Sequence, residues 1–309
     1  MNEADRVELI AATSGITART VTMLPGGNQN VVARVQSETR DVVVRFARDP
    51  SQAVDPFDIE VWALEAAADA GIHTSAVVAR GWAADTSYLV VEYIAGSTAS
   101  PDDLEAWHAV GTWLRALSTV DTTSAPAELF SRFGRDLDAA WRAHVVYNLA
   151  ELTDDDPLIE LGVYERSDQD TIRAMLASHL NRALPQGLIH GDLSTRNVVS
   201  GDRYAVIDWG AAHAGPVPWG DLDVLHRWHV MEDPQSPVSA DAWAEVLRGA
   251  GIDPEIARPV LRELAVLGAM DVVRWAIAQC PDRLDELRES SRRVIHRMLM
   301  ARVGRPTPG

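Results

Sequence analysis

The segment HGDLSTRN at residues 190–197, followed by DWG at residues 208–210, decides the fold. The intervening residues 198–207 form two short apolar runs around the turn-rich sequence SGDR. Two apolar runs around such a turn are typical of a β-hairpin. We therefore predict a hairpin that brings the two motifs together, with Asn197 opposite Asp208 if the turn centres on Asp202 and Arg203.

Three side chains of these motifs carry oxygen ligands or acceptors. In phosphoryl transfer an Asp accepts the proton of the substrate hydroxyl, while an Asn and a second Asp hold Mg²⁺ on the phosphates. Asp192, Asn197 and Asp208 fit these three roles. Caps of local turns are the alternative interpretation of Asp192 and Asn197, but the paired spacing favours phosphoryl transfer.

The motifs resemble those of the aminoglycoside phosphotransferases and their relatives in the wider phosphotransferase enzyme family, over roughly residues 20–225. In that family His-Gly-Asp is followed by Asn five residues after the Asp, as in His190 to Asn197. The segment IDWG at residues 207–210 is similar to the family's metal-binding segment.

The resemblance implies an α+β, two-lobe fold of the protein kinase-like type. Residues 1–95 would form a small N-lobe, rich in antiparallel β-strands and with one helix, and the hinge would lie at about residues 92–96. Residues 96–309 would form a larger, mainly helical C-lobe that carries catalysis and substrate binding. Protein kinases usually have Lys two residues after the catalytic Asp, where Ser194 stands here. This difference argues against protein substrates.

A glycine-containing loop precedes the first predicted hairpin of the N-lobe. Gly26, Gly27 and Asn30 lead into an apolar strand at residues 31–35, and residues 42–46 form the return strand. Glycines let backbone N–H groups approach phosphates without a Cβ in the way. We expect this loop to cover a nucleotide, although alone the pattern would also fit an ordinary loop.

The sequence contains no lysine, so all 28 basic residues are arginines. Arg45 stands where the resemblance places the phosphate-binding Lys of kinases, and a guanidinium can bind phosphate oxygens with two N–H groups. Its predicted ion-pair partner is Glu60, on a helix over residues 57–70 that begins after an Asp-Pro pair. Glu65 is the competing partner, and a solvent-exposed Arg45 is the alternative.

The apolar segment 88–94 predicts a buried strand that ends at Ala-Gly-Ser. The resemblance implies that this strand leads into the hinge between the lobes. Backbone groups of Glu92, Tyr93 and Ile94 would then bind the edge of adenine.

Three- and four-residue apolar spacing predicts helices beyond residue 101. The first contains Leu104, Trp107, Val110, Gly111 and Leu114, and later ones cover roughly residues 135–150, 168–183, 240–250, 255–278 and 281–303. We predict Trp219, Asp221, Asp223 and Asp271 as substrate-binding residues, although Asp221 also matches a structural Asp of the family. For Asp271 an ion pair with Arg274 is the alternative, and the acidic run 154–156 is typical of a solvated loop.

Composition limits the class of partner. The net charge of −17 argues against nucleic acid, because neutralising phosphates needs a basic patch, and it would attract cationic substrates. Neither a signal segment nor a membrane span is evident, so we expect a cytoplasmic protein. The single Cys280 excludes an internal disulfide, and the sequence leaves the oligomeric state open.

These observations predict a kinase that transfers the γ-phosphoryl group of ATP, or of GTP, to a hydroxyl of a small molecule, with Mg²⁺ as cofactor. The acceptor could be an aminoglycoside or a related antibiotic. A metabolite kinase for a neutral sugar, choline or an amino-alcohol is the first alternative. An inactive pseudokinase is the second, because the Lys is missing and the Gly-rich loop is incomplete.

Overall fold

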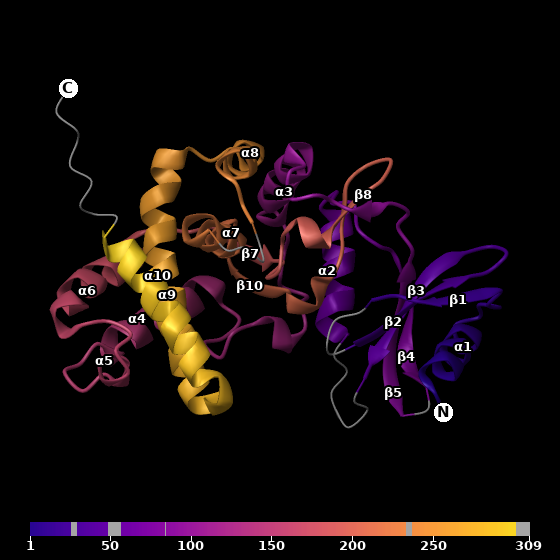
Figure 1. The fold of residues 1–309 in the computed structure, drawn as a ribbon, viewed down its shortest axis with the longest axis horizontal. Helices are drawn as coiled ribbons and strands as arrows, with labels where there is room; N and C mark the ends of the chain where they lie inside the picture. Colours follow the sequence, from indigo (N-terminus) through magenta and orange to yellow (C-terminus); the bar gives the residue numbers. More distant parts are fainter. Residues whose placement is uncertain (26–29, 49–56, 84, 233–236, 301–309) are drawn as a thin grey trace.

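The computed structural model describes residues 1–25, 30–48, 57–83, 85–232 and 237–300. The chain forms an N-terminal β-rich lobe and a larger helical lobe, here called the N-lobe and the C-lobe (Figure 1). This arrangement confirms the predicted fold class. None of the described helices is both long and apolar enough to cross a membrane.

The N-lobe is built on a five-stranded antiparallel sheet in the order β1-β2-β3-β5-β4. Its strands are β1 (Thr20–Met23), β2 (Asn30–Gln36), β3 (Asp41–Ala47), β4 (Val77–Ala83) and β5 (Thr86–Glu92). In β3 alternate residues face opposite sides of the sheet, as the period of two requires. Val42, Val44 and Phe46 are buried in the cluster that includes helix α1 (Glu3–Thr13).

Helix α2 (Asp58–Asp69) lies between the sheet and the C-lobe, on the opposite side from α1 (Figure 1). Leu64 of α2 is buried with Leu89 and Val91 of β5. The prediction of one N-lobe helix was therefore incomplete, because α1 is a second one. The N-cap side chain of Asn2 begins α1 by accepting the Asp5 N–H.

The predicted hairpin is present as β8 (Val198–Ser200) and β9 (Ala205–Val206), joined on its open edge by β6 (Ser97–Thr98). Its register differs by one residue from the prediction. Val198 pairs with Val206, and the Ile207 N–H donates to the Asn197 carbonyl, so Ile207 and not Asp208 stands opposite Asn197. A two-stranded pair of β7 (Gln186–Ile189) and β10 (His213–Pro216) flanks this region.

The C-lobe is helical, as predicted. Its helices are α3 (Leu104–Leu117), α4 (Leu137–Glu151), α5 (Pro157–Glu160), α6 (Gln169–Ser178), α7 (Trp219–Met231), α8 (Ala240–Ala250), α9 (Pro254–Gln279) and α10 (Leu284–Met300). Helices α3 and α8 cross closely because Gly111 faces the Val246 carbonyl and Gly249 faces the His108 carbonyl. A Cβ at either glycine would collide with the partner backbone.

The segment after α2 fixes the N-lobe to the hairpin. The Val206 N–H donates to the His73 carbonyl, and the Thr74 hydroxyl donates to the Val206 carbonyl at 2.8 Å. The indole N–H of the buried Trp209 in turn donates to the Thr74 hydroxyl at 3.0 Å. These bonds place the segment 208–210 directly beside α2.

Candidate active site

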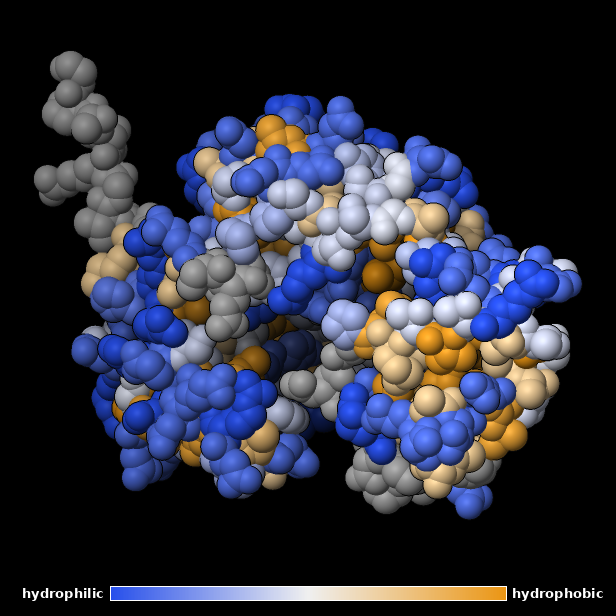
Figure 2. All heavy atoms as spheres, turned by 45° about the vertical axis from the view of Figure 1, so that its right-hand side comes forward, coloured by the Kyte–Doolittle hydropathy of each residue, from blue (hydrophilic) through white to orange (hydrophobic). Residues whose placement is uncertain are grey.

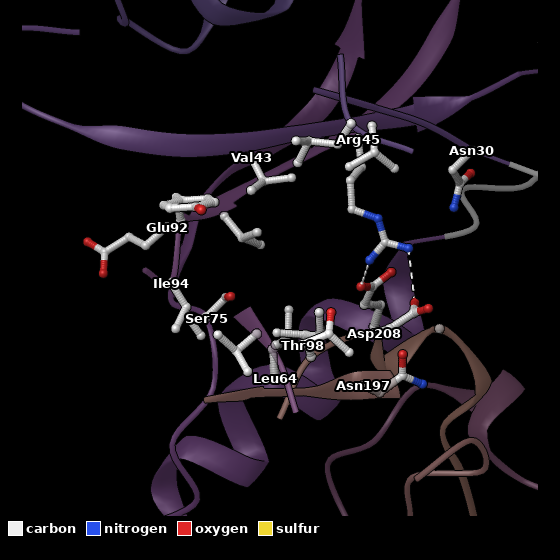
Figure 3. A pocket seen from close by; sticks show the side chains of 18 of the residues that line it. Asn30, Val43, Arg45, Leu64, Ser75, Glu92, Ile94, Thr98, Asn197 and Asp208 are labelled. Atoms are coloured by element: carbon white, nitrogen blue, oxygen red, sulfur yellow. Dashed lines mark hydrogen bonds and ion pairs between the residues drawn. The ribbon is translucent and has the colours of Figure 1, made fainter. Parts of the chain in front are cut away.

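A guanidinium joins the two lobes in the cleft. Arg45 projects from β3 on the side opposite the apolar α1 face, and it forms an ion pair with Glu60 of α2. Its second amino group, Nη2, lies 3.1 Å from Oδ1 of Asp208 (Figure 3). Arg45 thus contacts one acid from each lobe, and the structure brings together the pair predicted from the sequence.

Glu60 is the buried member of this cluster, with 3% of its surface exposed. Burial, together with the nearby Asp208 carboxylate, raises the pKa of Glu60 above its usual range even though Arg45 opposes this shift. The competing candidate, Glu65, is exposed to solvent on the same helix.

Asp208 adopts a left-handed backbone conformation, with φ at 66°. Such a conformation is uncommon for a residue other than glycine. Asp208 lies two residues after the end of β9 and remains half-exposed, with 50% of its side chain accessible. Its carboxylate therefore reaches the cleft.

The loop that follows β7 presents Asp192 beside Asn197. The Asn197 amide donates to the Asp192 backbone carbonyl at 2.8 Å and to Oδ2 of Asp192 at 3.0 Å. The other carboxylate oxygen, Oδ1, accepts a bond from the Arg196 guanidinium at 2.8 Å. The Asp192 carboxylate is therefore held on both oxygens.

His190 connects this loop to the segment 207–210, a role that the sequence analysis missed. Its Nε2 lies 3.1 Å from the Ile207 carbonyl, and its Nδ1 lies 3.3 Å from the Asp192 N–H. Because a carbonyl only accepts, Nε2 carries the proton and Nδ1 accepts from the backbone. Complete burial lowers the pKa of His190, which keeps the ring neutral. The only sequence signal is its position directly before Gly-Asp.

Asp221 holds the backbone of the same loop through hydrogen bonds. It lies in α7 with 2% of its surface exposed, and it accepts the N–H groups of His190 at 3.0 Å and Gly191 at 2.8 Å. Gly191 has φ of 85° and packs against the Ala211 carbonyl, which leaves no room for a Cβ. The structure therefore places Asp221 under the loop, in line with the structural alternative rather than with acceptor binding.

The end of β5 forms the back of the cleft. The Glu92 N–H donates to the Ala76 carbonyl, and the Tyr93 N–H donates to the Asp41 carbonyl. Both donors are therefore used by the fold. The Glu92 side chain points away from the cavity, whereas Ile94 lies at its edge (Figure 3).

The cleft between the lobes has a volume of about 870 Å³ and is visible as a hollow in the surface (Figure 2). Asp192, Asn197 and Asp208 line its C-lobe side. On the N-lobe side and around the end of β5 it is lined by residues that include Asn30, Val43, Arg45, Glu60, Glu92, Tyr93 and Ile94. Gly26 and Gly27, which were predicted to cover the nucleotide, lie outside the described residues.

The other predicted substrate residues do not line this cleft. Trp219 is buried in the main hydrophobic cluster. Asp223 is buried against Arg227, with 3.1 Å between Oδ2 and Nε, and burial raises its pKa.

Asp271 is also committed to partners within the C-lobe. It accepts bonds from His144 at 2.7 Å and Asn148 at 2.9 Å, both on α4. The alternative partner predicted for it, Arg274, pairs instead with Asp156 at 2.8 Å. Asp156 is buried, so the interpretation of the acidic run as a solvated loop was wrong at this residue.

The donor set at the hairpin end fits Mg²⁺. The Asn197 amide nitrogen is occupied by Asp192, and its oxygen points toward the side of the cavity where Asp208 lies (Figure 3). Mg²⁺ prefers such oxygen ligands and is usually held by one or two protein groups together with substrate phosphates. Among the described residues, no group of three His, Cys, Asp or Glu side chains forms a separate metal site.

A strand cation paired with a helix acid, beside a loop carboxylate and a half-exposed Asp in an interlobe cleft, defines a kinase-like phosphotransferase site. Residues 20–264 match the sequence model of the phosphotransferase enzyme family. The chain belongs to this family, as the sequence resemblance predicted.

Solved structures share the fold. Aminoglycoside phosphotransferase APH(4)-Ia superposes with a TM-score of 0.65 at 16% identity, over 96% of this chain and 99% of that chain. The GDP and kanamycin complex of APH(2")-IIia superposes with a TM-score of 0.61 at 14% identity, over 97% of this chain and 99% of that chain. Spectinomycin phosphotransferase APH(9)-Ia, in complex with ADP and spectinomycin, superposes with a TM-score of 0.55 at 15% identity, over 98% of this chain and 99% of that chain. No protein of curated function matches the sequence significantly.

Proposed function

We propose that this protein transfers the γ-phosphoryl group of ATP to a hydroxyl group of a small molecule. The observation that carries the proposal is the convergence of Asp192, Asp208 and Arg45 on one cleft. Each group suits one part of the reaction: a proton acceptor, a metal ligand and a phosphate-binding cation. The volume of about 870 Å³ is in the range of pockets that bind small molecules.

The hinge supports adenine binding. Because the N–H groups of Glu92 and Tyr93 donate within the fold, the next backbone donor along the hinge is that of Ile94. A carbonyl at Glu92 and an N–H at Ile94 would match the donor and acceptor edge of adenine. We therefore propose ATP as the donor, with GTP as the alternative.

In the proposed reaction, Asp192 orients the acceptor hydroxyl and takes its proton. The acceptor oxygen forms a bond to the γ-phosphorus as the bond to the β–γ bridging oxygen breaks, and the electron pair leaves with ADP. Bound Mg²⁺ would neutralise charge on the phosphates, and Asn197 and Asp208 would hold it. Arg45 would bind phosphate oxygens from the N-lobe side.

The acceptor is proposed only as a hydroxyl compound. An aminoglycoside-like cation needs several convergent acids, since micromolar binding corresponds to about 8 kcal/mol. Asp221, Asp223 and Asp271 are engaged by groups of the protein itself. A neutral acceptor such as a sugar or an amino-alcohol therefore belongs in the same test as cationic antibiotics.

The test is Mg²⁺-dependent phosphate transfer from ATP and from GTP to a panel of cationic antibiotics and neutral hydroxyl compounds, read as the mass gain of one phosphate. Asp192→Asn should lower the turnover rate by about 10²–10⁴-fold, the usual contribution of a general base, while nucleotide affinity by calorimetry stays close to that of the wild type. Nucleotide binding without transfer or ATP hydrolysis would support the pseudokinase alternative. Unchanged turnover in Asp192→Asn would remove this residue from the role of base.

A further inference from the structure

The catalytic loop carries one cation, and it contacts the proposed base. Residues 190–197 contain a single basic side chain apart from His190, namely Arg196. Its Nη2 lies 2.8 Å from Oδ1 of Asp192, four residues earlier in the chain. The position two residues after the base is taken by Ser194, which is buried and neutral.

Two features of the fold define the position of this guanidinium. Arg196 lies in the short 3₁₀ helix Thr195–Asn197, which turns its side chain back toward Asp192. The guanidinium carbon also lies 5.3 Å from the ring centroid of Trp228 on α7, within the range of a cation–π contact. About half of the Arg196 side chain is exposed, so it stands at the open side of the loop.

Arg196 can compensate the negative charge of Asp192. A carboxylate facing the anionic γ-phosphoryl group opposes the approach of phosphate by Coulomb repulsion. A fixed cation on Oδ1 compensates this charge, and a guanidinium orients a carboxylate better than a mobile ammonium group does. Asn197 fixes the other oxygen at 3.0 Å, so the two contacts together determine the rotation of the carboxyl group.

We propose that Arg196 is a positioning residue, which acts through Asp192 by orienting its carboxylate and compensating its charge during phosphoryl transfer. The proposal rests on the function proposed above. It assigns to Arg196, from four residues after the base, the charge compensation that no lysine in this chain can provide.

The test uses Mg·ATP hydrolysis, with water as the acceptor, so no identified substrate is needed. Arg196→Gln should lower the turnover rate by roughly a hundredfold, the scale of one preorganised electrostatic contact, with little change in the KM for ATP. Arg196→Lys should recover part of this loss. Arg203→Gln, at an exposed position of the turn that follows the loop, is the matched control and should leave turnover unchanged.

A double-mutant cycle distinguishes action through Asp192 from direct contact with phosphate. In an Asp192→Asn background, the further change Arg196→Gln should have almost no effect, because the group on which Arg196 acts is gone. Multiplied losses in the double mutant would overturn the proposal. So would an Arg196→Gln variant with wild-type turnover, or a loss that Arg203→Gln reproduces.

The proposed function can fail separately. If the wild type neither hydrolyses ATP or GTP nor transfers phosphate to any compound of the acceptor panel, kinase activity itself is contradicted and the role of Arg196 with it. If the wild type is active, Asp192→Asn shows its expected loss of turnover and Arg196→Gln is fully active, only the role of Arg196 is contradicted. Thermal melting of each variant verifies that a loss of rate is not a loss of fold.

Discussion

Two arginines of this protein each contact two acidic residues, yet their surroundings differ. In the cleft, Arg45 contacts Glu60 and Asp208, and the Asp208 carboxylate is half-exposed. In the C-lobe, Arg274 contacts Asp156 at 2.8 Å and Glu151 at 3.5 Å.

Asp156 shows what a purely structural carboxylate looks like. Its side chain is completely inaccessible, and it accepts bonds from the Leu158 N–H at 3.0 Å, the Tyr164 hydroxyl at 2.6 Å and Arg274. Every oxygen is used by the protein, whereas Asp208 has one side-chain partner, Arg45, among the described residues. Both acids form an ion pair with an arginine, so the ion pair itself does not distinguish them. The difference is that the Asp208 carboxylate is accessible and can bind a further ligand, whereas the Asp156 carboxylate cannot.

The largest expected effect tests the cleft. Asp208→Asn should lower Mg·ATP turnover by about a thousandfold, equivalent to about 4 kcal/mol of barrier, because the proposed metal ligand loses its negative charge. Stability should change little, since the side chain is half-exposed. Steady-state kinetics over a Mg²⁺ titration measure the first effect, and urea unfolding measures the second. Asp202→Asn, on the exposed hairpin turn, is the control and should keep the turnover of the wild type. An equal loss of turnover in both variants would contradict a specific role of Asp208.

The opposite result is expected for Asp156→Asn. An Asn can still cap α5, but it leaves the buried Arg274 without its full counter-charge, and breaking a buried pair costs about 3 kcal/mol. Urea unfolding should show this loss, while turnover per folded molecule stays unchanged. Asp154→Asn, two residues earlier and 84% exposed, should have no measurable effect on stability. A drop in turnover of folded Asp156→Asn would contradict a purely structural role.

A smaller effect is expected for nucleotide affinity. Arg45→Gln should weaken ATP binding by about tenfold to a hundredfold, or about 1.4–2.7 kcal/mol, because the phosphates lose a charged donor. Calorimetry with a non-hydrolysable ATP analogue measures the change. Arg48→Gln, which removes an exposed arginine just beyond the same strand, should bind like the wild type.

The smallest effect concerns pH. Because burial holds the pKa of Glu60 above its ordinary value of 4.5, the folded protein binds this proton more tightly than the unfolded chain does. This stabilising contribution is complete below pH 4.5 and is lost as the pH rises through the folded pKa, by about 1.4 kcal/mol for each unit of difference.

Urea unfolding of the wild type and Glu60→Gln across this pH range measures the contribution. The stability of the wild type relative to Glu60→Gln should decrease as the pH rises above 4.5. Glu65→Gln, on the exposed side of α2, should follow the wild type at every pH. A pH-independent difference for Glu60→Gln would contradict the raised pKa.

The family resemblance of the motifs predicted the fold class, whereas local signals predicted the hairpin. Strands β2 and β3 alternate buried and partly exposed residues, and the turn-rich break lies between two apolar runs. The predicted register was wrong by one residue, because Val199 pairs with Ala205 and the turn therefore centres on Asp202 rather than between Asp202 and Arg203. The bounds of helix α7 were not predicted, because its apolar residues are interrupted by buried acids.

Contacts between distant segments were beyond sequence reasoning. The sequence offered Arg274 as a partner for Asp271 at a helical spacing, but the actual partners are His144 and Asn148, more than a hundred residues earlier. The same holds for Asp156 and Arg274, 118 residues apart. Spacing along the chain identifies neighbours on one helix. Contacts between residues of different helices depend on tertiary packing, which the spacing does not reveal.

The neutral ring of His190 has a consequence for how this protein tolerates motion. The His190 imidazole forms hydrogen bonds with both segments that carry Asp192 and Asp208. The distance between these two acids is therefore fixed by contacts within the C-lobe. Arg45 is the member of this group that comes from the N-lobe. A movement of the N-lobe that admits or releases nucleotide would carry Arg45 away while the spacing of the proposed base, Asp192, and the proposed metal ligand, Asp208, stays constant. Opening the cleft would then not require these two groups to be repositioned in each cycle.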